Sequence, residues 1–492
     1  MSFNDLDFYP FLSILLLLLL GIQCLVRNER AAQLIRKGLL LGASFAVIWS
    51  YRPEFCLSTA VVILITYAGA LLVERAGTGK MRIAGLFVTV LVLWLGYFKY
   101  FNFLCSTFAS LTGQALSFSR IAAPIGISFY IFTAVGYLLD VAWEKYPAER
   151  NLLNLSLMLA FFPKLLCGPL VRGDEFLPQL RENRRMTTER FTFGIQLFAF
   201  GFFKKAVLAN HMARFLDSVF FAPSAFSMGT LWLAMLSNMP ALYFDFSGYS
   251  DMAIGISRIM GIDLRKNFNL PFITTNISDF WSRWHMTLTE WLQSYLFNPL
   301  AVRFRRMMAG KPKAFRKKYK LLPECAAAVI TFFVSGIWHG VGFNFAIFGL
   351  LHGFFYVVQK VFAQARKAKG KATSAGLRPL PMLASFFLIN LIQVFFRTDT
   401  PGDAVRFYQA LFVPHAGVFF PSFWSIMGFV FLIGEIVLAW MRQKKRGETE
   451  LNAALPSLNL RTVPGLTLFL FFVGLTLALG YFGESYFVYE QF

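Results

Sequence analysis

Charged residues are scarce in this sequence. Lys, Arg, Asp and Glu make up 15% of the 492 residues, whereas they make up about 25% of an ordinary soluble protein. Hydrophobic residues make up 57%, and Phe alone occurs 59 times. A soluble chain of this length would usually divide into domains joined by polar linkers, but here apolar runs recur from one terminus to the other. The composition therefore excludes a soluble globular enzyme and predicts a protein embedded in a lipid bilayer.

Several chemical signatures are also missing. The five cysteines form no CxxC pair, no two histidines are spaced at i, i+4, and no HExxH occurs, so we expect no metal site. No GxxxxGK[ST] phosphate loop and no GxSxG elbow occurs, which argues against ATP-driven transport and serine hydrolysis. No Lys or Arg precedes the run Leu15 to Leu20, so we expect a retained first helix and no cleaved signal peptide.

Long apolar runs are the main feature that is present. A hydrocarbon core of about 30 Å requires roughly 20 apolar residues per helix. On this template we expect spans near residues 8–26, 38–52, 55–73, 83–101, 122–143, 192–210, 229–258, 323–338, 343–362, 382–397, 424–441 and 463–483. The stretches 152–170 and 268–300 are apolar but interrupted by prolines, which is typical of re-entrant or broken helices. The expected fold class is all-α, a polytopic membrane protein that forms one domain over residues 1–492, with about 11–13 transmembrane helices plus re-entrant or interfacial ones.

Positive charge is in excess, with 47 Lys and Arg against 26 Asp and Glu, a net charge of +21. On a soluble protein this excess would suggest nucleic acid as a partner. Here most basic residues cluster in short segments between spans, so the positive-inside rule predicts that these segments are cytoplasmic and that both termini lie outside. We therefore expect no nucleic-acid partner. The segments 302–321 and 363–380 are predicted to be basic cytoplasmic loops, and the first is basic enough to attract anionic lipid or an acidic partner.

Two histidines lie in unusual settings. His339 stands between glycines where two apolar runs meet, in the stretch from Ser335 to Asn344 that also contains Trp338. Buried polar groups at membrane depth are costly, so such a residue indicates a functional site. A helix-hairpin corner with a capping histidine is the competing interpretation. His285 lies within a run that is predicted to form one amphipathic helix over 280–292. Asp279, just before this run, and Arg283 are spaced as an i, i+4 ion pair. Its competing interpretation is an interfacial helix, in which Trp281 and Trp284 would favour the membrane surface.

Asp245 and Asp251 are two carboxylates in one apolar segment. Paired carboxylates can act as acid and base, as in glycosidases. The alternative is a structural role, in which they hold Arg258, a nearby histidine or a helix break in place. His352 is interpreted as a satisfied interior histidine.

A series of motifs resembles a known family. In chain order these are Phe162–Pro163–Lys164, Gly168–Pro169–Leu170–Val171–Arg172, Phe176–Leu177–Pro178–Gln179–Leu180, residues 244–251, Asn267–Phe268–Asn269, Phe280–Trp281–Ser282–Arg283–Trp284–His285, Trp338–His339–Gly340 and an aromatic tail over 486–492. From about residue 80 onward the sequence is similar to the membrane-bound O-acyltransferase (MBOAT) family, in its bacterial alginate O-acetyltransferase branch. The combination of an RWH motif with a WHG corner carries most of the resemblance.

The resemblance implies a core over residues 81–492 around a central cavity, with the helices of 1–80 peripheral to it. It implies that His339 and His285 are catalytic. Supporting or channel roles are expected for Trp338, Asn344, Trp281, Arg283, Trp284, Asp245 and Asp251, and donor docking for Arg303, Arg305 and Arg306. With a reference pKa of about 6.5, a histidine suits general base catalysis. A covalent acyl-histidine intermediate is the other route.

The resemblance also implies a reaction and its partners. We expect an O-acetyltransferase of the bacterial inner membrane that moves acetyl from a cytoplasmic thioester across the membrane to a cell-surface polysaccharide. The donor would be acetyl-CoA or a phosphopantetheinyl acyl carrier protein, with no bound cofactor, and a periplasmic esterase-like transferase would be a partner. The family's Tyr-x-Pro-Leu-Gly-Gly turn is replaced by Phe297–Asn298–Pro299–Leu300. That departure keeps open D-alanyl transfer from a carrier protein. A polymer exporter without chemistry is the alternative from another class.

Overall fold

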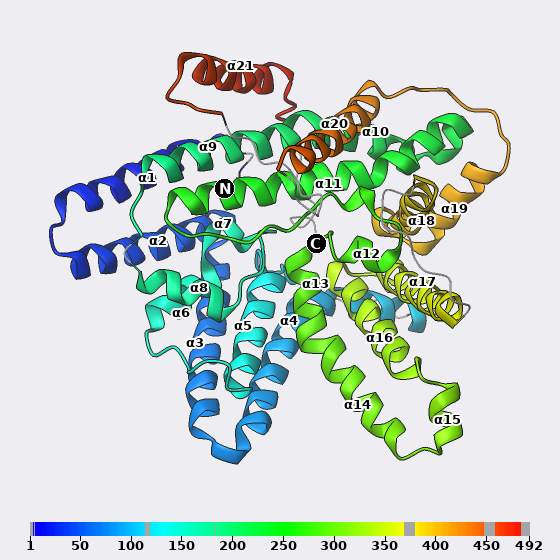
Figure 1. Ribbon diagram of the computed structural model, residues 1–492, viewed down its shortest axis with the longest axis horizontal. Helices are drawn as coiled ribbons and strands as arrows, with labels where there is room; N and C mark the ends of the chain where they lie inside the picture. Colours follow the sequence, from blue (N-terminus) through cyan, green and yellow to red (C-terminus); the bar gives the residue numbers. More distant parts are fainter. Residues whose placement is uncertain are drawn as a thin grey trace.

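The computed structural model describes residues 3, 5–113, 119–182, 184–368, 379–446 and 458–483, and over these residues the fold is all-α with no β-strand. Figure 1 shows the arrangement of the helices, viewed down the shortest axis of the molecule. The described helices are α1 (Phe8–Leu25), α2 (Glu29–Tyr51), α3 (Pro53–Arg75), α4 (Lys80–Thr112), α5 (Ile127–Ala142), α6 (Leu152–Ala160), α7 (Phe162–Leu165), α8 (Gly173–Arg181), α9 (Thr188–Phe203), α10 (Asn210–Phe221), α11 (Met228–Ile259), α12 (Ile277–Trp281), α13 (Met286–Leu292), α14 (Asn298–Ala309), α15 (Lys313–Lys318), α16 (Leu322–His339), α17 (Phe343–Ala368), α18 (Pro379–Arg397), α19 (Pro401–Phe412), α20 (Phe423–Arg446) and α21 (Val463–Leu479). Three short 3-10 turns are η1 (Gly77–Gly79), η3 (Pro223–Ala225) and η4 (Pro271–Ile273), and two π-helical segments are η2 (Lys204–Ala209) and η5 (Gln293–Phe297).

Within the described residues, nine helical segments are long and apolar enough to cross a membrane. They are Phe8–Leu25, Glu29–Tyr51, Pro53–Arg75, Gly77–Thr112, Thr188–Phe221, Leu322–His339, Phe343–Arg366, Pro379–Arg397 and Phe423–Lys444. Two apolar helices, α5 and α21, are shorter, and α11 is long but carries charged residues. These helices coincide with the expected spans, so the prediction of a polytopic α-helical membrane protein is confirmed.

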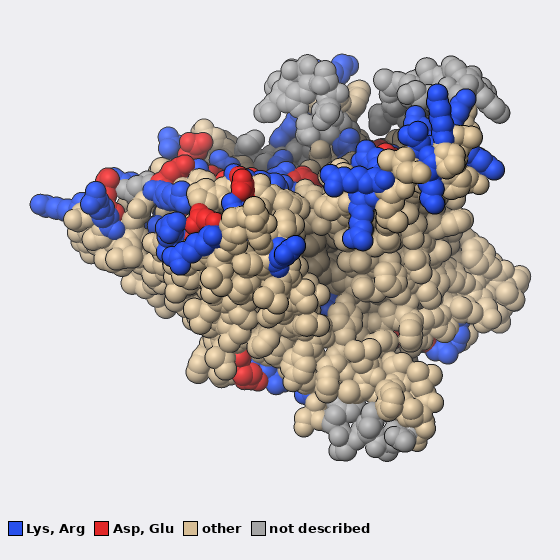
Figure 2. Space-filling view, turned by 90° about the horizontal axis from the view of Figure 1, so that it is seen from below, with Lys and Arg blue, Asp and Glu red and all other residues tan. Residues whose placement is uncertain are grey.

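Charge is distributed unevenly between the two faces of the molecule. Figure 2 shows Lys and Arg gathered along one face, above a broad band without charged side chains. The densest basic segment differs from the prediction, because 302–321 is not a loop: α14 continues to Ala309 and α15 forms a second, short helix. Of the second basic segment, residues 363–368 belong to α17. Residues 369–378 and the aromatic tail 486–492 lie outside the described part of the chain.

Helix α11 is the central element of the core and packs along α9. The two helices approach closely because glycines face each other: a Cβ on Gly201 would lie 2.4 Å from the Gly248 carbonyl oxygen, and a Cβ on Gly194 would lie 2.5 Å from that of Gly255. Small residues at such crossings let the backbones of membrane helices approach closely and so form packing contacts. In Figure 1, α9, α11 and α20 cross the upper part of the molecule, while α3, α4 and α5 lie below them.

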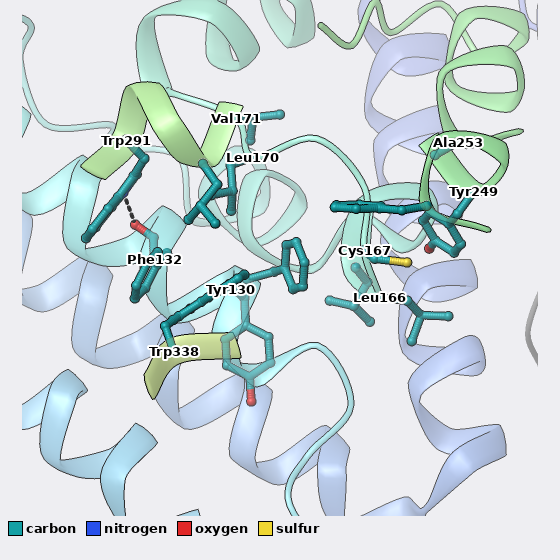
Figure 3. Packing of buried hydrophobic residues seen from close by; sticks show 14 of the residues in the cluster. Tyr130, Phe132, Leu166, Cys167, Leu170, Val171, Tyr249, Ala253, Trp291 and Trp338 are labelled. Atoms are coloured by element: carbon teal, nitrogen blue, oxygen red, sulfur yellow. Dashed lines mark hydrogen bonds between the residues drawn. The ribbon is translucent and has the colours of Figure 1, made fainter. Parts of the chain in front are cut away.

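The two interrupted stretches are buried in protein, as predicted. Helices α6 and α7 break at Phe161, and nearly every side chain from 154 to 171 is buried. The second stretch forms η4, α12, α13 and η5. Figure 3 shows how residues of the first stretch, from Leu166 to Val171, lie between aromatic rings of α5, Trp291 and Trp338, while Tyr249 and Ala253 of α11 border the same core. These broken segments therefore fill the centre of the molecule.

Candidate functional site

His339 is the last residue of α16, and its side chain is 2% exposed. The helix ends because Gly340 is extended, and α17 begins at Phe343. The two helices form a close pair: a Cβ on Gly336 would lie 2.3 Å from the Phe345 carbonyl oxygen and 2.9 Å from Gly349. Any larger residue at Gly336 would separate the helices. The glycines around His339 therefore serve to hold it inside a tightly packed hairpin.

The end of α16 is fixed by donors from α4. The Lys99 ammonium donates a hydrogen bond to the Trp338 carbonyl, and the Tyr100 hydroxyl donates one to the Ile337 carbonyl. The last carbonyls of a helix have no partner within the helix, so side-chain donors stabilise its end. Lys99 is buried, and its ammonium lies 5.8 Å from the centre of the Trp338 ring. Helix α4 thus fixes the end of α16, where His339 is the last residue.

His285 lies outside a helix, contrary to the prediction of one continuous helix over 280–292. Helix α12 ends at Trp281 and α13 begins at Met286. His285 has a left-handed backbone, with a φ of 43°, a conformation that costs a non-glycine residue about 1–3 kcal/mol. The backbone here pairs with the preceding segment, because the Met286 N–H donates to the Asn267 carbonyl at 2.8 Å. Such strain is concentrated at functional sites.

The imidazole of His285 is 0% exposed, so it does not reach the membrane surface. Its Nδ1 lies 3.4 Å from Oδ1 of Asn267, and the Thr287 hydroxyl donates to that same oxygen at 2.6 Å. Thr287 in turn accepts the Leu170 N–H. Because the Asn267 oxygen is an acceptor, His285 must donate from Nδ1, which leaves the lone pair on Nε2. The neighbours therefore assign His285 the tautomer that can take up a proton through Nε2.

Trp338 connects the two predicted histidines. Its ring centre lies 5.0 Å from that of His339 and 6.2 Å from that of His285. Phe129 and Phe132 of α5 pack against the other parts of the indole. His285, Lys99 and His352 all interact electrostatically with His339. The structure thus brings together side chains from four separate segments of the chain.

Two cavities approach this cluster. One of about 380 Å³ lies between the 278–297 segment and helices α16 and α17; it extends from Glu290 and Gln293 to Trp281 and to Ser335, one turn before His339. A smaller cavity of about 60 Å³ is lined by His339 and Lys99 themselves, together with residues 123–129, Leu166 and Trp338. His339 therefore borders the small cavity directly and lies one helical turn beyond the inner end of the large one.

The two predicted carboxylates lie away from the histidines, each paired with its own lysine. The Lys205 ammonium lies 2.5 Å from Asp245, and that of Lys204 lies 3.1 Å from Asp251 and 3.2 Å from Glu435. Arg258, one of the three contacts considered for them, covers the Phe193 ring instead. Both lysines reach inward because π-helical η2 places two consecutive residues in the core.

A third cavity lies beside these ion pairs, with a volume of about 430 Å³. It is lined by α9, α11 and α20, and Lys204, Asp251 and Glu435 form its polar wall. Each carboxylate is paired with an ammonium group. The two carboxylates are therefore not a free acid and base pair. Their arrangement supports the structural role that was the alternative for them.

The other predicted residues have mainly structural contacts. The Asn344 amide donates to the carbonyls of Phe395 and Thr398, at 3.2 and 2.6 Å, and so ties α17 to the end of α18. Trp284 stacks on Phe280 in the core. Arg283 forms the expected i, i+4 ion pair with Asp279 at 3.3 Å. The three arginines predicted to dock the donor are exposed on α14: Arg303, Arg305 and Arg306.

Sequence reasoning assigned His352 no function, yet its buried ring lies within this cluster. The Trp281 indole N–H donates to its Nδ1 at 3.3 Å. A repeated pattern could have revealed it, because Gly336–Ile337–Trp338–His339–Gly340 and Gly349–Leu350–Leu351–His352–Gly353 share the spacing G-x-x-H-G. Among the described residues, no group of three His, Cys, Asp or Glu side chains is placed to hold a metal ion.

Comparison with known proteins identifies the family. Residues 137–396 match the family model of the MBOAT, membrane-bound O-acyltransferase family. The chain belongs to this family. It is 34% identical to "Probable alginate O-acetylase AlgI" of Azotobacter vinelandii over 77% of this chain and 72% of that protein. It is 32% identical to "Peptidoglycan O-acetyltransferase" of Helicobacter pylori, over 64% of this chain and 62% of that protein. It is also 29% identical to "Teichoic acid D-alanyltransferase" of Streptococcus thermophilus, over 55% and 67%. As a member of the MBOAT family, the protein is an acyltransferase. Its clustered histidines, His285, His339 and His352, lie within the matched residues.

Proposed function

We propose that this acyltransferase moves an acetyl group from a cytoplasmic thioester through the membrane and onto a hydroxyl of a cell-surface polysaccharide. The observation that carries the proposal is the position of His339 between two cavities of different size. The large cavity, on the side of Glu290 and Gln293, fits the donor arm. The small one, of about 60 Å³, fits a short acyl group or a single hydroxyl at the other side. The names of relatives that acetylate polymers support acetyl as the transferred group and a polymer as the acceptor.

His339 acts as the general base. The acceptor hydroxyl oxygen attacks the thioester carbonyl carbon and forms the new C–O bond, while the hydroxyl proton passes to the imidazole. The tetrahedral intermediate then collapses: the C–S bond breaks, its electron pair goes to sulfur, and the imidazolium returns the proton to the leaving thiolate. An ester and a free thiol result. His285, with its lone pair on Nε2, stands on the other side of Trp338 and helps to position the hydroxyl.

The basic face is the cytoplasmic face in this proposal, and both termini lie outside in a bacterial inner membrane. Helices α14 and α15 carry part of the basic charge, and Arg303, Arg305 and Arg306 of α14 are exposed. Their charge fits the phosphates of acetyl-CoA. It also fits an acidic carrier protein, so D-alanyl transfer is the second candidate. A periplasmic esterase-like transferase would be a partner at the outer face, where it brings the polymer to this site.

The test measures transfer of radiolabelled acetyl from acetyl-CoA to polysaccharide in membrane vesicles, without any carrier protein. We expect transfer with the wild-type protein and a loss of about 10²–10⁴-fold in His339→Ala. His415→Ala is the matched control, because this histidine bonds only to loop carbonyls, those of Val413 and Phe226. Transfer only from a carrier-bound donor would favour the second candidate. Wild-type transfer by His339→Ala, or a defect in polymer export alone, would favour a transporter and contradict the proposal.

A further inference from the structure

His352 occupies the same place in a sequence pattern of α17 that His339 occupies in a pattern at the end of α16. Each histidine lies between two glycines in a G-x-x-H-G pattern, and the glycines form the contact between the helices: a Cβ on Gly349 would lie 2.3 Å from the Phe332 carbonyl oxygen. The His352 side chain is 1% exposed. Its ring touches Phe348 and so does that of His339, with ring centres 4.7 and 6.1 Å away. The two imidazoles therefore share one pocket of the hairpin.

Trp281 decides which nitrogen of His352 carries the hydrogen. An indole N–H can only donate, and it lies 3.3 Å from Nδ1 of His352. Nδ1 must therefore be the acceptor, so the neutral ring carries its hydrogen on Nε2. This tautomer is opposite to that of His285, where Asn267 accepts from Nδ1. Because the two nitrogens lie on opposite edges of the ring, Nε2–H points away from the Trp281 indole.

The Nε2–H of His352 is a buried donor with no acceptor among the residues that the structure describes. The Ser335 hydroxyl is likewise buried without a partner in the described chain, and it lines the inner end of the large cavity. Buried polar groups are almost always satisfied, so two such groups near His339 require an explanation. Aromatic rings surround His352, including Phe332 and Phe348. An oxygen atom of a ligand would satisfy the donor of His352.

We infer that His352 is a further catalytic residue, whose Nε2–H donates to the carbonyl oxygen of the acyl thioester, and that Trp281 is the positioning residue that fixes this tautomer. The inference rests on the proposed acyl transfer. When the hydroxyl attacks, the π electrons of the carbonyl move to its oxygen, and a neutral donor in a dry site stabilises that oxyanion. The same donor releases the oxygen when the C–S bond breaks. No proton is transferred to or from His352.

Donation and packing can be separated with two substitutions. His352→Gln keeps an N–H close to the position of Nε2, whereas His352→Leu keeps bulk but no donor. We expect a fall in kcat of about 10²–10³-fold for His352→Leu, the cost of one oxyanion donor, with KM for the donor little changed. His352→Gln should retain much more activity. A histidine that only fills space would give the opposite order, because leucine packs better than glutamine in an apolar pocket.

The closing experiment combines a spectroscopic readout with that activity assay. The full-length protein, labelled with ¹⁵N-histidine, has only five imidazoles to assign. We expect the His352 signal, identified by its loss in His352→Gln, to show protonation at Nε2, and Trp281→Phe to release this preference. Protonation at Nδ1 in the wild type, or wild-type kcat in a folded His352→Leu protein, would overturn the inference while acyl transfer by His339 stands. A wild-type protein that transfers no acyl group would overturn both.

Discussion

Two sets of buried polar groups lie in this membrane protein, and they are satisfied in different ways. Beside α11, Lys204 and Lys205 meet Asp251, Glu435 and Asp245, so that every ammonium group has a carboxylate. In the α16–α17 hairpin, the polar groups are neutral imidazoles and a hydroxyl among aromatic rings, and their neighbours fix tautomers without supplying a counter-ion. Matched ions hold helices together, whereas the hairpin contains a buried His352 Nε2–H with no acceptor among the described residues, a group that can contact a substrate.

The largest effect should come from breaking one matched ion pair. Lys205→Met leaves the Asp245 carboxylate buried without its ammonium partner, which typically costs about 3–5 kcal/mol of stability. We expect a large drop in thermal stability in detergent, with activity per folded molecule unchanged. The double variant Lys205→Met/Asp245→Leu should recover most of the loss, because no ion is then buried. Equal stability of the single variant and the wild type would show that the pair does not hold η2 and α11 together.

Loss of His285 should act on turnover and leave stability nearly unchanged. Its ring is buried against Phe246 and next to Trp338, and it positions the hydroxyl in the proposed reaction. We expect His285→Ala to lower kcat by about 10²-fold and to leave residual activity, because His339 remains as base. Rates for acetyl transfer from acetyl-CoA measure this. Full activity in the folded variant would remove His285 from the reaction.

A smaller effect should follow from releasing the His285 tautomer. Asn267→Leu removes the acceptor of Nδ1–H, and we expect a fall in kcat of about tenfold, equivalent to about one hydrogen bond. Ser250→Ala is the matched control, since it removes the partner of the Asn267 amide nitrogen and leaves the bond to His285. A loss of equal size in both variants would mean that Asn267 acts through packing alone.

The smallest effect should come from the exposed arginines of α14. Replacing Arg303, Arg305 and Arg306 by alanine should raise KM for the acyl donor about two- to fivefold at low salt, and the difference should shrink as salt screens the charges. Arg27→Ala/Arg30→Ala, in the basic segment at the start of α2, is the control. If both variants behave alike, α14 is not a docking surface and its charge serves topology only.

Sequence reasoning predicted the spans because apolar length is a local signal, and it singled out His285 and His339, whose catalytic roles stay predictions. It missed the break at His285, since that break depends on backbone pairing with Asn267, a residue of another segment. For Asp245 and Asp251 it considered Arg258, a histidine or a helix break, and not the two lysines. Lys204 and Lys205 stand at the end of an expected span, where lysine is ordinary, and only the π-helical turn brings both inward. His352 was interpreted as an interior histidine without a function. The sequence could not show the donor that sets its tautomer, because that donor is Trp281, far away in the chain.

The central claim is that acyl donor and acceptor reach His339 from opposite faces of the membrane. Purified protein in sealed proteoliposomes of known orientation, with acetyl-CoA on one side and an acceptor polysaccharide only on the other, tests it directly. We predict ester formation when acetyl-CoA faces the basic surface of α14, none with the sides exchanged, and none with His339→Ala. Equal transfer in both orientations, or transfer that requires donor and acceptor on the same side, would contradict this account.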